Sequence, residues 1–432
     1  MKTYRILIIA SLCILGSVFQ IAYAQSVTIN LDVFGLNTNQ SAADEAVNNA
    51  CTGIGNSGTS AAAVDLLNTC AILNALNDED PDLSIGLDRL LPEEAFAISD
   101  TLTDASDLQV TNVNARINTL REQQSDTSNQ QASSLLSGGA AAAPSIENVE
   151  LFITGQISDG DIDGRRLQQD ADLSASQVTF GADYRLSDNF IVGAGIGIFQ
   201  QSTDFSNTAG DSEVEGTNLT FFSTYSRESV GYLDVVLDIG TNEFDFSRQI
   251  SLDGADQVLA VSSTDSSSYS LSVGVGKNFR FSGWDVGPYA RAALTRASVD
   301  GYSEQATSNQ TGFGSTLSIG SQSISSTTLS VGATVARVVN TSKAVLVPQA
   351  SLEFAIEADG DKDPLSAFFL ADPNQQVFVV DGEERDTSSA NLGIGATAIF
   401  AKGRSAFAYY ETRLAHDFIT QNWFKVGARI EF

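Results

Sequence analysis

Apolar and polar residues alternate along the last twelve positions of the chain, 421–432. The apolar positions are Phe424, Val426, Ala428, Ile430 and Phe432. Between them stand three charged residues, Lys425, Arg429 and Glu431. A period of two predicts a β-strand with one apolar and one polar face. A tilted strand of ~9–11 residues can cross a bilayer, so we expect lipid on the apolar side and a polar lumen on the other.

The same alternation recurs through the C-terminal two thirds of the chain and predicts twelve strands: 148–158, 174–186, 190–202, 216–227, 230–242, 266–281, 283–297, 325–339, 343–357, 387–401, 404–416 and 421–432. Connections of one to three residues alternate with long polar insertions at 159–173, 203–215, 243–265, 298–324 and 358–386. Tight turns on one side and longer loops on the other are typical of outer-membrane barrels. The pattern predicts the all-β class, as a 12-stranded antiparallel transmembrane β-barrel at 148–432.

The part of the chain before this barrel has helical patterns. Helices are predicted at 41–50, 59–76, 87–98 and 106–122, after a strand at 26–34. In the second helix Val64, Leu67 and Ala71 recur at spacings of three and four and predict its buried stripe. We expect a small helical domain at 25–105, a helix at 106–122 and a flexible linker at 123–147. Partial disorder of the domain until it folds outside the cell is the alternative.

The first 24 residues have the order of a secretory signal peptide: basic residues, a short apolar run, and the exit Ala22-Tyr23-Ala24. A membrane anchor is the alternative. Export leaves two cysteines, Cys51 and Cys70, in the mature chain. A cysteine pair in an exported protein with a single histidine predicts a disulfide rather than a zinc site.

The net charge of the chain excludes one class of partner. The chain has 23 basic and 53 acidic residues, a net charge of −30, and no basic cluster. Binding of nucleic acid is therefore not expected, because phosphate binding needs clustered Lys and Arg. Beyond the signal, no stretch approaches ~18 unbroken apolar residues, so the sequence predicts no transmembrane helix. A closed barrel is then the way for this chain to cross lipid with its backbone groups paired.

Three segments carry a resemblance to a known family: FGADYRLSDNFIVGAGIG at 180–197, YYETRLAHDF at 409–418 and the terminal GARIEF. The region 149–432 resembles the translocator barrel of type V secretion systems, the classical autotransporters. The helix DLQVTNVNARINTLR at 107–121 resembles the segment that occupies the barrel pore in this family. The resemblance implies an outer-membrane protein that carries its own N-terminal passenger, here 25–105, to the cell surface. It implies two partners, the outer-membrane lipid and the barrel-assembly machinery, for which the terminal strand ending in Phe432 is the expected assembly signal.

The resemblance also bears on the fate of the passenger and on the pore. In some self-cleaving members two adjacent asparagines of the pore helix carry the cleavage, and the matching positions here are Thr111 and Asn112. We therefore expect an uncleaved passenger. The residues expected to line the pore, close to Arg116 and Arg121 of the helix, are Glu411, Arg413, Lys425, Arg429 and Glu431.

Catalysis is not expected. Serine hydrolases, which this family includes among its passengers, need a histidine base. The only histidine, His416, falls in a predicted barrel strand, on its outward face. The single Gly210-Asp211-Ser212 sequence has no companion motif.

One acidic segment could bind calcium. Asp159, Asp161, Asp163 and Asp170 have the spacing of a calcium loop with Gly164 at its sixth position. Two arginines inside the segment and the lack of flanking helices favour solvated acidic loops instead. No other cofactor is expected.

Two function classes remain. In the first, an autotransporter displays its acidic passenger at the cell surface for adhesion or contact with a ligand that the sequence does not identify. In the second, a porin-like channel uses its N-terminal segment as a lumen plug.

Overall fold

The computed structural model describes residues 36–431 except 58–59, 77–80, 93, 127–148, 166, 168, 207–209, 251–257, 359–363, 383–386 and 402–403. All described residues belong to one compact unit, Leu36–Phe432. The predicted signal peptide, the predicted strand 26–34, most of the predicted linker and Phe432 lie outside the described residues.

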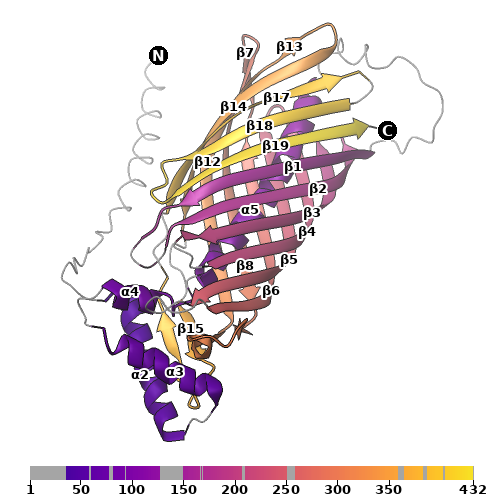
Figure 1. The fold of residues 1–432 in the computed structure, drawn as a ribbon. Helices are drawn as coiled ribbons and strands as arrows, with labels where there is room; N and C mark the ends of the chain where they lie inside the picture. The colour runs from indigo at the N-terminus through magenta and orange to yellow at the C-terminus, as the bar shows by residue number, and fades with distance from the viewer. Residues whose placement is uncertain are drawn as a thin grey trace, which may run out of the picture. The chain divides into compact units, whose positions relative to one another are not determined.

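Twelve long antiparallel strands among the described residues form a closed ring (Figure 1). They are β1 (Val149–Ile162), β2 (Ala171–Ser187), β3 (Phe190–Phe205), β4 (Gly210–Arg227), β5 (Gly231–Ile250), β6 (Val258–Gly276), β8 (Trp284–Val299), β12 (Gln322–Arg337), β14 (Ala344–Glu357), β17 (Ser388–Phe400), β18 (Arg404–Leu414) and β19 (Ile419–Glu431). Each strand pairs with the next, and β19 pairs with β1 to close the ring. The predicted 12-stranded barrel is confirmed. Closure leaves no strand edge unpaired in lipid.

The last strand has the two faces that its sequence predicts. Its outward side chains are exposed: Phe424, Val426, Ala428 and Ile430. Its inward side chains Trp423, Lys425 and Arg429 are buried. Lipid-facing and lumen-facing residues therefore alternate along it, as in other membrane barrels.

The strands extend further than predicted at one end. We call the end with short connections such as 188–189 and 228–230 the turn end, and the opposite end the loop end. Two predicted loops, 203–215 and 243–265, are largely strand, because β4, β5 and β6 continue to pair at the loop end. Their inward residues there are apolar and buried: Val214, Phe244, Phe246, Ile250, Val258 and Ala260. The strand bounds predicted from alternation and turn residues left these polar stretches as loops, whereas in the structure they are strand extensions that pack on protein.

Short elements occupy the turn and loop regions. At the turn end, β7 (Phe279–Phe281) and β13 (Val339–Asn340) flank hairpins. The turn between β7 and β8 is Ser282-Gly283, with φ values of 51° and 79°, as the favoured two-residue hairpin turn needs. At the loop end lie β9 (Tyr302–Ser303), β10 (Gln305–Ala306), η2 (Phe313–Ser315), β11 (Leu317–Ile319), β15 (Leu365–Phe369) and β16 (Phe378–Val380). Four of these form a small sheet in the order β16-β15-β11-β9.

Within the described residues, four helices precede the barrel: α2 (Thr38–Ser57), α3 (Ala61–Leu73), α4 (Pro81–Asp88) and α5 (Glu94–Asp126). The predicted helix 87–98 is wrong, because α4 ends at Asp88 and α5 begins only at Glu94. Helix α5 then continues through the predicted helix 106–122. None of the described helices combines the length and the apolar composition that a membrane span requires.

The predicted buried stripe of α3 is also wrong in phase. Val64 is 50% exposed, and the buried side chains include Ala63, Leu66, Cys70 and Leu73. Both stripes have helical spacing in the sequence. The face that is buried is the one that packs on η2 and α2, which come from distant parts of the chain.

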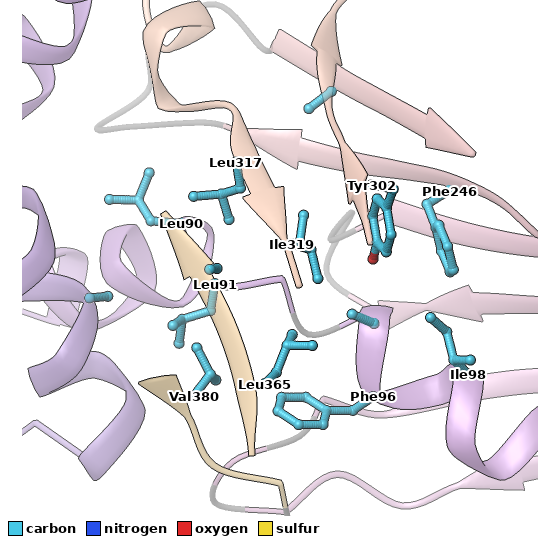
Figure 2. Packing of buried hydrophobic residues seen from close by; sticks show 14 of the residues in the cluster. Leu90, Leu91, Phe96, Ile98, Phe246, Tyr302, Leu317, Ile319, Leu365 and Val380 are labelled. Carbon is cyan, nitrogen blue, oxygen red and sulfur yellow. The ribbon is translucent and has the colours of Figure 1, made fainter. Parts of the chain in front are cut away.

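Helices α2, α3 and α4, the four-stranded sheet and η2 form a structure that we call the cap. Its apolar core is shared with the first turns of α5 and with the loop end of the barrel. Figure 2 shows members of this core from the segment after α4, the start of α5, strand β5 and the four-stranded sheet: Leu90, Leu91, Phe96, Ile98, Phe246, Tyr302, Leu317, Ile319, Leu365 and Val380. The cap therefore has no separate core of its own.

Candidate functional site

Helix α5 lies in the lumen of the barrel and is held by an apolar stripe along its second half (Figure 1). The buried residues of this stripe recur at helical spacing: Val110, Val113, Ile117 and Leu120. They pack with four inward residues of the wall: Phe152, Ile191, Phe222 and Val236. Burial of such side chains stabilises contact by roughly 1.5–3 kcal/mol each, as an upper value. The helix is thus fixed to the β1–β5 side of the lumen.

Glycines in the wall make room for this contact. A Cβ on Gly193 would lie 2.1 Å from the Phe222 ring, and one on Gly181 would lie 2.2 Å from the Phe152 ring. A Cβ on Gly197 would lie 2.5 Å from Oε1 of Gln109 on α5. The glycines of the segment 180–197 therefore form the surface on which aromatic rings and the helix rest.

A buried amide of the helix binds the same wall. The Gln109 side chain donates from Nε2 to Thr220 Oγ1 at 2.6 Å. Its Oε1 accepts from Gln177 Nε2 and from Thr179 Oγ1, both at 2.9 Å. Asn112 donates from Nδ2 to Gln177 Oε1 at 3.1 Å. These bonds fix the rotation of the helix about its axis as well as its depth.

Two arginines anchor the helix near the turn end. Arg116 donates to Glu150 Oε2 at 2.5 Å and to Asp183 Oδ2 at 2.8 Å, and all three side chains are buried. Arg429 of β19 donates to the other Glu150 oxygen at 2.8 Å. Arg121 pairs with Asp234 and stacks on the Tyr232 ring. Glu150 thus brings together the helix and the last strand, as the expected proximity of Arg429 to Arg116 requires.

A polar cavity of about 300 Å³ lies beside α5, and most of its wall residues come from β8, β12, β14, β17, β18 and β19. Three of the expected pore-lining residues, Glu411, Arg413 and Lys425, line it. Lys425 pairs with Glu411 at 2.9 Å, and the Arg413 guanidinium lies over the Trp423 ring. Arg429 is on Glu150 instead, and the Glu431 side chain lies outside the described residues.

The cap binds the barrel loops through groups that no sequence motif singles out. Asp65 of α3 is buried, and its Oδ2 accepts the backbone N–H groups of Gly312 and Gly314 at 2.9 and 2.8 Å. Thr69 of the same helix contacts Ser315 Oγ at 3.3 Å. A carboxylate facing two backbone donors is a strong, charge-assisted contact. It joins residues that are about 250 positions apart.

Helix α2 makes a second contact with the loops. Asn39 donates from Nδ2 to the Asp381 carbonyl, and its Oδ1 accepts the Asp381 N–H, both at 2.8 Å. Further along the helix, a Cβ on Gly53 would lie 2.4 Å from Nδ2 of the Asn374 side chain, so a larger residue would require that side chain to move.

The predicted disulfide between Cys51 and Cys70 is confirmed. It joins α2 to α3 across a Cα–Cα distance of 6.6 Å. The bond holds together the two helices that contact the loops, so it stabilises the cap surface as one piece.

A third contact between the cap region and the barrel is ionic, and its side chains are buried. Arg248 of β5 donates from Nε and Nη2 to both Glu304 oxygens at 2.8 and 2.6 Å, and from Nη1 to the Arg89 carbonyl at 2.6 Å. Glu94, the first residue of α5, lies 3.5 Å from Arg248 Nε. Burial raises the pKa of Glu94 to about 8, because desolvation outweighs the attraction of Arg248, and the nearby Glu304 adds to the rise.

The acidic segment at 159–170 is only partly a loop. Asp159 and Asp161 lie within β1 and are exposed, and Asp170 accepts the N–H of Gly164 in the connection that also holds Asp163. The described residues contain no group of three or more His, Cys, Asp or Glu arranged to hold a metal ion. Calcium binding stays a prediction.

Asp161 is the first of four acidic residues that lie directly opposite one another on neighbouring strands at the loop end. This aspartate row consists of Asp161, Asp172, Asp204 and Asp211. Like charges directly opposite each other across strands are destabilising.

His416 does not lie on an outward strand position, so that prediction is wrong. β18 ends at Leu414, and Ala415 adopts a φ of 51°, which turns the chain. His416 then lines the luminal cavity, and its Nδ1 accepts the backbone N–H groups of Phe418 and Ile419 at 3.3 and 3.0 Å. Its observed contacts are those of a residue that orders the loop between β18 and β19.

The model of the autotransporter β-domain family matches residues 151–411. Among solved structures, the translocator domain of the autotransporter NalP from Neisseria meningitidis is similar, with a TM-score of 0.51 and 15% identity over 72% of this chain and 98% of that chain. The β domain of the Bordetella autotransporter BrkA has a TM-score of 0.46 and 18% identity over 66% of this chain and 100% of that chain. No curated protein matches the sequence.

The NalP similarity concerns the fold alone, which is the 12-stranded barrel described above. The family match is broader evidence, because it covers more than half of the 432 residues and includes eleven of the twelve barrel strands. The barrel of this family is a transporter rather than an enzyme. The chain belongs to the autotransporter β-domain family and is an outer-membrane autotransporter.

Proposed function

We propose that this autotransporter displays its own N-terminal domain at the cell surface, as a folded cap on the loop end of its barrel. The direction of α5 carries the proposal. Glu94 at the start of the helix contacts Arg248 near the loop end, whereas Arg116 and Arg121 bind carboxylates near the turn end. Short turns of outer-membrane barrels face the periplasm and longer loops face outward. The direction of the helix thus supports a passenger that has passed through the lumen and stays outside.

We expect the cap to stay covalently attached. Position 111, where self-cleaving relatives resembled by this helix have an asparagine, is Thr111, and the buried Asn112 is held by Gln177. Gel electrophoresis of outer-membrane fractions should give one band at the mass of the mature chain. A separate N-terminal fragment would contradict this expectation.

Display of such a cap at the cell surface supports a role in adhesion or in contact with a surface ligand. A hydrolase of the serine class is not supported, since 25–122 contains no histidine or lysine in its sequence. Insertion by the barrel-assembly machinery is proposed to depend on the outward apolar face of β19, which would contact both the machinery and the lipid.

Cysteine labelling of intact cells tests the display. Val64 on α3 is half exposed, and Ser229 is exposed in a turn at the opposite end of the barrel. A membrane-impermeant maleimide should label a Val64→Cys variant in intact cells. It should label the matched Ser229→Cys variant only after the outer membrane is permeabilised. The reverse pattern would overturn the proposal and favour a lumen plug inserted from inside.

The polar cavity beside α5 supports a second candidate, a porin-like channel that the helix plugs. Its polar lining and its volume of about 300 Å³ suit small hydrated solutes. Liposome swelling measures this function: uptake of a small sugar by liposomes that hold the full chain would support a channel. Uptake that appears only after deletion of α5 would support a helix that seals the lumen.

A further inference from the structure

The buried ionic cluster at the start of α5 joins three separate parts of the molecule. Glu94 belongs to the helix, Arg248 to the barrel strand β5, and Glu304 to the loop segment between β9 and β10. The side chains of these residues are 6%, 2% and 3% exposed. Any movement of the cap away from the barrel must therefore open this cluster to water.

The cluster has two carboxyl groups for one guanidinium. Glu304 accepts two of the Arg248 guanidinium hydrogen bonds, one on each carboxylate oxygen, and also accepts the Leu317 N–H at 2.7 Å. Glu94 keeps only the longer contact of 3.5 Å with Arg248. With both carboxyls ionised the buried cluster would carry a net charge of −1, which is costly without water. A proton on Glu94 removes that charge.

We propose that a proton on Glu94 holds the cap closed on the barrel, so that the cap loosens as the pH rises and this proton is lost. The proposal builds on the cap described above, but it does not depend on the side of the membrane that the cap faces. The ligand of the switch is the proton itself.

The groups around Glu94 act on its ionisation in both directions, and burial has the largest effect. Asp211 of β4 disfavours its ionisation as Glu304 does, whereas Arg248 favours it, as does the hydrogen bond of the Glu94 carboxylate at the start of the helix. Tyr302 of β9 is buried against the cluster, and burial raises its pKa, so it stays neutral. Burial is the largest influence, and it raises the pKa of Glu94 to about 8 in the closed cap, against 4.5 for an exposed glutamate.

The pH window follows from these two values. A group whose pKa is higher in the closed state contributes stability that is complete below pH 4.5. That stability falls as the pH rises toward 8, and above this value it is constant, because both states are then ionised. One proton can raise the opening equilibrium by at most about tenfold per pH unit.

Hydrogen exchange of the purified full chain in detergent, measured between about pH 5 and pH 8, tests the switch. The readout is the protection factor of the α3 amides, which removes the pH dependence of intrinsic exchange. In the wild-type chain protection should fall steeply with pH, up to about tenfold per unit. In Glu94→Gln, which keeps the shape and removes the charge, protection should change by less than about twofold over the whole range.

Two further variants keep the test decisive. Burial also raises the pKa of Asp88 in the cap, so Asp88→Asn is the matched control and should keep most of the slope. Glu304→Gln leaves one carboxyl for one guanidinium, so the slope should vanish there too, which gives a second test if Glu94→Gln folds poorly. A wild-type chain without a slope, or a slope that survives Glu94→Gln, would overturn the proposal. These results are independent of the labelling of intact cells, so failure of the switch and failure of surface display can be told apart.

Discussion

Removal of the Arg116 guanidinium should release the second half of α5 from the barrel wall. Arg116 is 3% exposed and serves two carboxylates, on Glu150 and Asp183, that are 11% and 3% exposed. Breaking a buried pair by removing one partner costs about 3–5 kcal/mol. Because Arg429 remains on Glu150, the loss falls mainly on Asp183, and we take the lower value of about 3 kcal/mol. This corresponds to a roughly 150-fold increase in local opening.

Hydrogen exchange of residues 113–120 in Arg116→Met measures this opening directly. The matched control is Arg280→Met, because Arg280 pairs with Asp285 at 2.8 Å while 43% exposed. Such an exposed pair contributes about 0.2–1 kcal/mol, so the control should leave the exchange of α5 unchanged. Arg116→Lys should give an intermediate value, since lysine keeps the charge but cannot form the forked contact. Exchange in Arg116→Met within about threefold of the wild type would refute the anchoring role.

Three further changes test other parts of the fold. Gly193→Val should destabilise the folded barrel by about 1–3 kcal/mol, because its Cβ would overlap the Phe222 ring, and the heat-modified gel band should appear at a lower temperature. Gly155→Val is the control and should not do this, because a Cβ at position 155 would make an ordinary van der Waals contact of 3.9 Å with the Val426 side chain. Asp65→Ala should speed exchange of the η2 amides at least fivefold, corresponding to about 1–3 kcal/mol, and unchanged exchange would exclude the contact from cap stability. Asp204→Ser should raise the melting temperature, because it removes a charge that faces Asp172 and Asp211 in the aspartate row. This gain should shrink in high salt. A gain in melting temperature that persists at 1 M salt, where the Debye length is about 3 Å, would contradict an electrostatic cause.

Much of the barrel could be predicted from the sequence because lipid imposes a rule on each residue separately. A strand between lipid and a polar lumen needs apolar and polar residues in alternation, and the last strand shows this in Phe424, Lys425 and Val426. The same rule was insufficient at the loop end, where β4, β5 and β6 continue to pair beyond the predicted strand ends. There Phe244 and Phe246 still alternate with polar residues, but they pack on the cap rather than line a lumen. The alternation was present there, but the polar residues of the stretch led to the prediction of a loop.

The cap and its contacts were decided by the tertiary structure. The sequence offered two stripes on α3, and the choice of Leu66 over Val64 depended on a loop helix almost 250 residues away. No sequence pattern distinguishes Asp65 from the other acidic residues, and its role follows from the two backbone N–H donors that the η2 region places beside it. The sequence by itself determined the barrel, its turns and the disulfide, because those follow from local periods and from composition. Which carboxylates became buried, and beside which arginine, depended on the packing of segments distant in the chain, and no local pattern records that packing.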